Sequence, residues 1–292
     1  GGNYNVLVGD EAGTALTTGD GNVAVGFEAL KTEDANGEST AIGYQALKTQ
    51  NAGASGLNTA VGYQAGTAIT TATFNTLVGG LSGDALTVGN KNTALGYNTL
   101  SADTKGDRNV AVGTDALASQ NFTTSTDSYN TAVGMNAGNA VTTGEQNTIV
   151  GGLAADSLTT GGLNVAFGLH ALGGDTAGSR STALGYSALL TQNFTTATNT
   201  FNTAVGFEAG KSITTGTQNS LIGYGAGTAL TDADFNVAVG TNALPADTLG
   251  SKSTAIGTQA LGTQNFTTAT DSFNTAVGHA AGLSVTTGVQ NA

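Results

Sequence analysis

The sequence predicts an all-β protein, a parallel β-roll or β-solenoid of about 17 stacked coils, most of which share one 17-residue repeat. Three observations carry this prediction. A short block ending in glycine recurs along the whole chain of 292 residues. Small residues dominate, with 45 glycines, one proline and 6% aromatic residues, so an ordinary compact core is not expected. Threonine, asparagine and glycine cluster where a helix would require alanine, leucine, glutamate and lysine.

The repeated block reads Asn or Ser, two small or apolar residues, one aliphatic or aromatic residue, and a closing glycine, here called the anchor glycine. The sixteen anchor glycines are Gly9, Gly26, Gly43, Gly62, Gly79, Gly96, Gly113, Gly134, Gly151, Gly168, Gly185, Gly206, Gly223, Gly240, Gly257 and Gly278. Most steps between them share the Gly9-to-Gly26 spacing, and longer steps, such as Gly113 to Gly134, recur every fourth coil and create a 72-residue super-repeat. We therefore expect one continuous array over residues 1–292, which starts and stops within a unit like a segment of a longer fibre protein.

Each unit predicts a strand followed by turns, and one coil alone cannot bury its apolar face. The residue directly before the anchor glycine is always Val, Ile, Leu or Phe, as at Val8 and Ile42, and we expect this column to face the interior. The residue before that is also apolar, as at Ala60 and Leu77, and alternation along a strand points it to the opposite face. Apolar residues on both faces predict a partner surface, for which a second copy of the chain is the simplest source.

The rest of each coil also follows a pattern. Alanine stands three residues after the anchor glycine in fourteen of the sixteen coils, which predicts a close approach of backbones. One larger apolar residue stands either four residues after it, as at Leu30, or seven residues after it, as at Ile69, so we expect a constant core volume. The Thr-Thr-Gly corners, as at Gly216, predict tight bends, and asparagines in stacked coils predict side-chain amide ladders.

Charge and composition exclude several functional classes. The net charge of −12 repels phosphate backbones and anionic lipid, so neither nucleic acid nor a membrane surface is an expected partner. No apolar stretch approaches the length of about 18 residues that a transmembrane helix needs. The absence of cysteine excludes disulfides, thiolate metal sites and cysteine nucleophiles.

The stretches NTAVGYQAG (58–66), NTAVGFEAG (202–210) and STAIGTQAL (253–261) resemble the head repeats of YadA-like trimeric autotransporter adhesins. They are equally similar to the NTAIGYQAL-type arrays of phage tail-fibre proteins. The resemblance covers the entire chain and implies a trimeric, left-handed parallel β-roll in an extracellular, cell-surface or virion appendage. The common 17-residue coil of this chain is longer than the adhesin coils.

Two features are candidates for contact with a glycan or receptor. The longest coils repeat Asn-Phe-Thr at Asn121 and Phe122, at Asn193 and Phe194, and at Asn265 and Phe266. These sequences are either exposed recognition or glycosylation sites, or ordinary turn chemistry. The second candidate is a tyrosine column directly after the anchor glycines, which contains Tyr44, Tyr63, Tyr97, Tyr186 and Tyr224, with Phe27 and Phe207. Such a column either binds sugars or packs between subunits.

No catalytic or cofactor site is expected. A carboxylate column, formed by Glu33, Asp103, Asp175 and Asp247, stands seven residues after anchor glycines. Its members lie four coils apart, roughly 19 Å, too far for a glycosidase pair, and we expect surface ion pairs with Arg108, Arg180 and Lys252 instead. His170 and His279 lie in different columns, so we expect no metal or triad role. The run from Asp232 to Asp234 lacks the glycine and glutamate of a calcium loop.

These observations predict a non-enzymatic structural fibre that provides reach, stiffness and attachment, with no cofactor. Its expected partners are further copies of itself, as a homotrimer or homopolymer, and a host-cell surface glycan or protein. Two alternatives stay open. One is a free extracellular filament, and the other is a glycan-binding module that uses the long loops.

Overall fold

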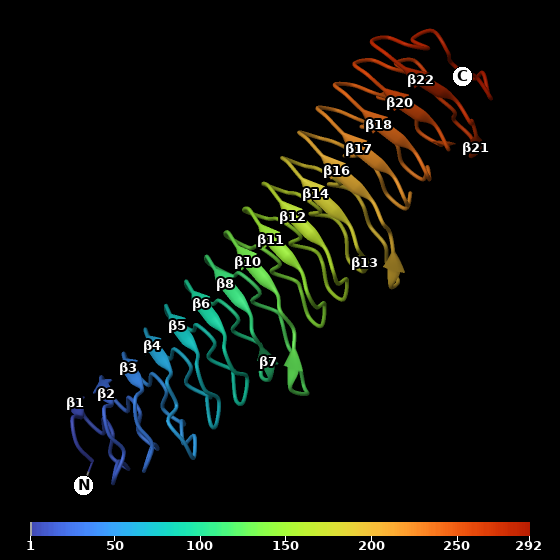
Figure 1. The fold of residues 1–292 in the computed structure, drawn as a ribbon. Helices are drawn as coiled ribbons and strands as arrows, with labels where there is room; N and C mark the ends of the chain where they lie inside the picture. The colour runs from blue at the N-terminus through green and yellow to red at the C-terminus, as the bar shows by residue number, and fades with distance from the viewer. Residues whose placement is uncertain (1) are drawn as a thin grey trace. The chain divides into compact units, whose positions relative to one another are not determined.

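The computed structural model describes residues 2–292 and divides them into two compact units, one ending at Gln146 and one beginning at Asn147. Each unit is a stack of coils, and each coil contributes one three-residue strand to a parallel sheet (Figure 1). The described residues form strands, turns and bends, without a helix, and therefore without a helix that could cross a membrane. The predicted β-solenoid with 17-residue coils is confirmed.

The first unit has eight three-residue strands. They are β1 (Val6–Val8), β2 (Val23–Val25), β3 (Thr40–Ile42), β4 (Thr59–Val61), β5 (Thr76–Val78), β6 (Thr93–Leu95), β8 (Val110–Val112) and β10 (Thr131–Val133). The second unit has eight more: β11 (Thr148–Val150), β12 (Val165–Phe167), β14 (Thr182–Leu184), β16 (Thr203–Val205), β17 (Ser220–Ile222), β18 (Val237–Val239), β20 (Thr254–Ile256) and β22 (Thr275–Val277).

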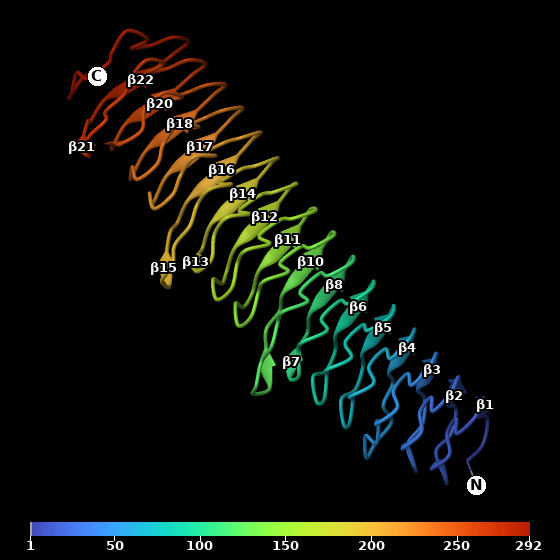
Figure 2. The same ribbon diagram turned by 180° about the vertical axis from the view of Figure 1, so that it is seen from behind.

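Six two-residue strands lie away from this row, where the longest coil of a super-repeat meets the coil before it (Figure 2). They form three parallel pairs: β7 (Gly106–Asp107) with β9 (Thr126–Asp127), β13 (Gly178–Ser179) with β15 (Thr198–Asn199), and β19 (Gly250–Ser251) with β21 (Thr270–Asp271). The longest coils therefore add a second short ladder to the stack.

Neighbouring three-residue strands pair in parallel and in register. For example, Thr59, Ala60 and Val61 of β4 lie opposite Thr76, Leu77 and Val78 of β5. Equivalent residues of successive coils therefore form straight columns, and any property repeated in the sequence becomes a continuous row on the surface or in the core.

The structure reverses the predicted faces of the strand. The middle strand residue points inward, and Ala60, Leu77 and Ile149 are fully buried. The residue directly before the anchor glycine points outward, and 38% of Ile42 and 54% of Phe167 are exposed. The prediction failed because it placed the larger side chain inside. Most coils place alanine at the inward position, and Leu77, Ile149 and Leu221 point inward in coils where glycine or alanine stands four residues after the anchor glycine. We call the row directly before the anchor glycines the outward column.

The predicted compensation of core volume is confirmed. In eight coils, here called leucine coils, a buried leucine stands four residues after the anchor glycine. In the other eight, here called glycine coils, glycine or alanine stands there and a larger apolar residue stands seven after the anchor. A Cβ added at Gly66 would lie 2.8 Å from Leu77 Cδ1 and 3.1 Å from Ile69 Cδ1. The glycine therefore vacates the space that the neighbouring side chains occupy.

Anchor glycines are required by both conformation and close packing. Their φ angles lie between +119° and +144°, a region that side chains disfavour. A Cβ on Gly168 would lie 2.5 Å from the carbonyl oxygen of Gly185 in the next coil. The corner glycine Gly216 has no positive φ, but a Cβ there would collide with the carbonyl oxygen of Ala233. Successive coils therefore approach too closely for a side chain at Gly168 and at Gly216, although Ala233 occupies the corner of the next coil.

The predicted asparagine ladder is present and buried. The backbone N–H of Asn92 donates to Asn75 Oδ1 at 2.9 Å, and the N–H of Asn109 donates to Asn92 Oδ1 at 2.8 Å. The Asn92 side-chain amide also donates to the Gly106 carbonyl at 2.9 Å. Each asparagine thus joins two coils and closes its own turn, so that buried backbone groups are paired.

Candidate functional site

The Asn-Phe-Thr candidates are corrected by the structure, because their phenylalanines belong to the core. Only 5–7% of Phe122, Phe194 and Phe266 is exposed. The backbone N–H of Phe122 donates to Asp103 Oδ1 at 3.1 Å, and its carbonyl accepts from Thr104 Oγ1 at 2.8 Å. The partner asparagines Asn121, Asn193 and Asn265 stay exposed. The rings are therefore unavailable for sugar contact. The Asn-Phe-Thr segments form ordinary turns, which was the other interpretation of their sequence.

The carboxylate column is also corrected, since its members are buried and make no surface ion pairs. Glu33, Asp103, Asp175 and Asp247 are all fully buried. Asp175 Oδ1 accepts the backbone N–H groups of Gly178 at 3.0 Å and of Phe194 at 3.0 Å. The predicted cations pair elsewhere or not at all: Arg108 pairs with Asp127, Lys252 pairs with Asp271, and Arg180 lies over the Phe201 ring.

Each buried carboxylate is matched with a buried glutamine one coil later. Gln192 Nε2 donates to Asp175 Oδ2 at 2.5 Å, and Gln192 Oε1 accepts from Asn202 Nδ2 at 2.9 Å. Gln50, Gln120 and Gln264 make the same bridge to Glu33, Asp103 and Asp247. Burial raises the pKa of Asp103, against the opposing effect of its hydrogen bonds. Sequence reasoning missed these glutamines, although each follows its carboxylate by one full repeat, as Gln192 follows Asp175.

The tyrosine column lies on the surface, and most of its rings stack on one another. Phe27, Tyr44 and Tyr63 form one stack in the first unit, with ring centroids 5.3 Å apart at both steps. Tyr186, Phe207 and Tyr224 form a second stack, with centroids 4.9 Å and 5.5 Å apart. Tyr97 is exposed and lies outside these stacks. Stacked rings present mostly their edges, an arrangement suited to packing against another chain.

A charged cluster borders the tyrosine column in the first unit. Lys31 pairs with Glu11 and, at 2.5 Å, with Glu28, and Lys48 pairs with Glu28 at 2.6 Å. Hydrogen bonds from Lys31, Lys48 and Gln45 lower the pKa of Glu28 to about 2. The lysines are about one-third exposed, so the cluster contributes modestly to stability and is screened by salt.

A second exposed column stands five residues before the anchor glycines, and sequence reasoning missed it. We call it the aromatic–cation column. In the first unit it includes Leu57, Phe74, Lys91, Arg108 and Tyr129, and in the second Leu163, Arg180, Phe201, Phe235, Lys252 and Phe273. All these residues adopt φ angles between 49° and 64°. The sequence signal that could have revealed this column is its constant place, directly before each ladder asparagine or serine.

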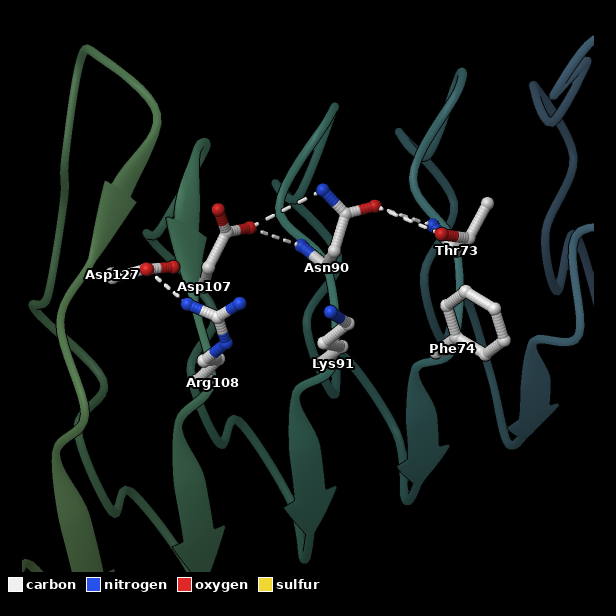
Figure 3. Close-up of a pocket in the computed structure, with 7 residues that line it drawn as sticks. All are labelled: Thr73, Phe74, Asn90, Lys91, Asp107, Arg108 and Asp127. Atoms are coloured by element: carbon white, nitrogen blue, oxygen red, sulfur yellow. Dashed lines mark hydrogen bonds and ion pairs between the residues drawn. The ribbon is translucent and has the colours of Figure 1, made fainter.

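A cavity of about 340 Å³ opens on this column in the first unit (Figure 3). Phe74, Lys91 and Arg108 lie side by side along one row of its wall. Thr73, Asn90 and Asp107 form a parallel row, and Asp127 stands beside Arg108. The cavity therefore combines one aromatic face, two cations and several oxygen atoms. Most of the lining is polar or charged, which suits a polar ligand rather than a wholly apolar one.

The fold defines the chain as a β-solenoid repeat protein. Comparisons with protein-family models, curated proteins and solved structures give no match. Residues 2–292 contain no group of three His, Asp or Glu side chains placed to hold a metal ion.

Proposed function

We propose that this chain is a structural segment, the shaft or head of an extracellular or virion appendage, in which three copies pack side by side. The observation that carries the proposal is the outward column. An aliphatic or aromatic residue occupies this place in every coil, and several members are more than one-third exposed. A continuous apolar row on a surface marks an interaction site.

The seam of the trimer is formed by the outward column and the tyrosine column beside it. Both columns are straight because the strands pair in register, so a second copy can contact one coil after another along the stack. Aromatic side chains of the tyrosine column add large buried areas to such a contact. The number three rests on the resemblance to trimeric adhesin and tail-fibre repeats described above.

Reach and stiffness follow from the stacking. Within each unit, neighbouring coils are tied by strand hydrogen bonds and, where asparagines follow each other, by the asparagine ladder, as between Asn219 and Asn236 (3.0 Å). Each added coil lengthens a solenoid by one strand spacing, about 4.8 Å. An adhesin, a tail fibre and a free filament all use these properties, and immunogold labelling of the source material with an antibody to the exposed loop around Asn193 distinguishes them.

Sedimentation equilibrium of the soluble chain tests the trimer, against a single-chain mass of 28.5 kDa. We expect the mass of three chains. The triple variant Ile42→Lys, Leu95→Lys, Phe167→Lys places charges in the seam and should yield the single-chain mass. A control variant, Thr124→Lys, Thr196→Lys, Thr268→Lys, changes exposed loop residues and should remain trimeric. A single-chain mass for the unmodified protein would overturn the proposal.

A further inference from the structure

The aromatic–cation column departs from the repeat at one place. Only at Lys91 and Arg108 do two cations follow each other in successive coils of this column, and Phe74 stands directly before them. At the corresponding positions of the second unit the column reads Gln218, Phe235 and Lys252. A property that every coil shares serves the scaffold, whereas a unique combination on an otherwise regular surface is the expected location of recognition.

The polar row behind this combination is already satisfied by internal hydrogen bonds. Asn90 Oδ1 accepts from the Thr73 N–H at 2.8 Å, and the Asn90 N–H donates to Asp107 Oδ1 at 2.5 Å (Figure 3). Asp107 Oδ2 accepts from Ser125 Oγ at 3.0 Å, and only 9% of Asp107 is exposed. This row is therefore a rigid wall, and its buried carboxylate is engaged by neutral donors.

The two cations have different roles. Arg108 pairs with Asp127, donates to Tyr129 Oη at 3.0 Å and lies 5.3 Å from the centre of the Tyr129 ring. Lys91 is exposed and forms no ion pair with the residues that the structure describes. The lysine ammonium thus remains uncompensated at the mouth of the cavity, although the chain as a whole carries a charge of −12. It is available to pair with an anion from outside the chain.

Phe74 supplies the apolar part of the site. Its side chain is 53% exposed and lies in the coil next to Lys91, in the same row (Figure 3). Adjacent coils are about 4.8 Å apart, so a flat ligand over Phe74 brings a substituent to the lysine. A bare phosphate or sulfate would pair with Lys91 but would make no contact with the Phe74 ring. A sugar ring with a carboxylate uses both.

We propose that this cavity binds a carboxylated sugar within a glycan, with the ring packed on Phe74 and the carboxylate paired with Lys91. The Arg108–Asp127 pair presents a donor and an acceptor for sugar hydroxyls. The site gives the appendage a specific attachment point and so rests on the function proposed above. It lies on the aromatic–cation column, apart from the outward and tyrosine columns assigned to the seam.

The second unit provides a matched control. Thr217 donates through both its N–H (2.6 Å) and Oγ1 (2.9 Å) to Asp234 Oδ1, which repeats the polar row. Lys252 is already paired with Asp271 at 2.6 Å and lies 5.2 Å from the Phe273 ring. Gln146 and Gln218 occupy the position of Phe74 with φ angles of 59° and 57°, so glutamine is compatible with this backbone.

Isothermal titration calorimetry of the full chain tests the proposal with four probes: tetragalacturonate, its methyl ester, sialyllactose and lactose. At least one acidic probe should bind, more weakly as salt is added. Binding of tetragalacturonate alone identifies a uronate polysaccharide as the source, and binding of sialyllactose alone identifies a sialylated glycan. Lys91→Gln and Phe74→Gln should each weaken binding about tenfold, whereas Lys252→Gln and Phe235→Gln should leave it unchanged.

Three results would overturn the proposal: no binding of either acidic probe, equal binding of the methyl ester or lactose, or equal binding by the Lys91 and Phe74 variants. Circular dichroism of each variant confirms that the coil stack is retained. The sedimentation mass of the same samples shows separately whether the trimer has formed, so failure of the sugar site is distinguishable from failure of the fibre proposal.

Discussion

Glycine coils and leucine coils share one backbone path but fill their interiors differently. In the glycine coil at Gly223, Gly227 leaves room for Leu230, and the interior is wholly apolar there. In the leucine coil at Gly168, Leu172 fills that room, and the buried Asp175 takes the position of Leu230. At this position the first kind gains stability from apolar burial, whereas the second depends on side-chain hydrogen bonds that cross to the next coil. A solenoid can therefore include a buried carboxylate if the next coil supplies its hydrogen-bond partners.

The largest expected effect comes from the feature that both kinds share. Gly168→Ala and Gly223→Ala should each destabilise the protein by about 3–5 kcal/mol, because both anchor glycines have strongly positive φ angles and abut the next coil. Denaturant unfolding measures both. The costs should agree, since a Cβ would lie 2.5 Å and 2.6 Å from the next carbonyl oxygen. A loss confined to one variant would mean that the backbone path differs between the two kinds of coil.

The next largest loss of stability should come from placing an interior residue of one kind of coil, glycine or leucine, into the other kind. Leu230→Gln places an amide where the preceding coil offers Ile213 instead of a carboxylate, and it should cost about 2–4 kcal/mol. Gln192→Leu removes the donor to Asp175 and should cost about 1–3 kcal/mol. Both values come from equilibrium unfolding, with Leu230→Met as the conservative control. Tolerance of Leu230→Gln would show that the interior does not discriminate between the two kinds.

A smaller effect is the pH dependence of the leucine coil at Asp103. Burial raises the pKa of Asp103 above its ordinary value of 3.8, so its contribution to stability is complete below that value and declines as pH rises through the raised pKa. The stability of Asp103→Asn relative to the native protein should therefore improve between acidic and neutral pH. Leu86→Met, in a glycine coil, is the control and should show no such trend. An opposite slope for Asp103→Asn would refute the assigned pKa direction.

The smallest expected effect concerns the surface cluster around Glu28, whose pKa shift has the opposite sign. Its pKa is lowered from 4.5 to about 2, so its contribution is present above pH 4.5 and is lost as pH falls toward 2. Lys31→Gln with Lys48→Gln should flatten this acid slope, as should added salt. Thermal melts in the acidic range measure it. An unchanged slope in the double variant would assign the acid sensitivity to other carboxylates.

The sequence-based predictions succeeded where periodicity alone decided the outcome. Parallel stacking, the asparagine ladder and the exchange of Leu47 against Ile69 all follow from spacing, because in-register coils turn each repeated position into a column. The prediction of which strand face is buried was wrong. In a three-residue strand, alternation shows which residues share a face but not which face points inward. Residue size then suggested the wrong face, because the buried Ala60 is smaller than the outward Val61.

The candidate site was harder to predict, because it depends on contacts across coils of unequal length. Phe122 was a candidate for surface contact, but its ring is buried and its backbone N–H donates to the carboxylate of Asp103. The cavity beside Phe74 needs the cations of two further coils and a rigid polar row behind them. Only the unequal distribution of Lys91 and Arg108 among the repeats hinted at it.

In the proposed function, the outward column is covered by other copies of the chain. The native protein has no cysteine, so one introduced thiol reports on contacts between copies without interference. Ile42→Cys should be joined rapidly between chains by a short bifunctional thiol reagent at low protein concentration. Thr124→Cys, on an exposed loop, should not be joined. Crosslinking confined to Thr124→Cys, or absent from both variants, would contradict the claim.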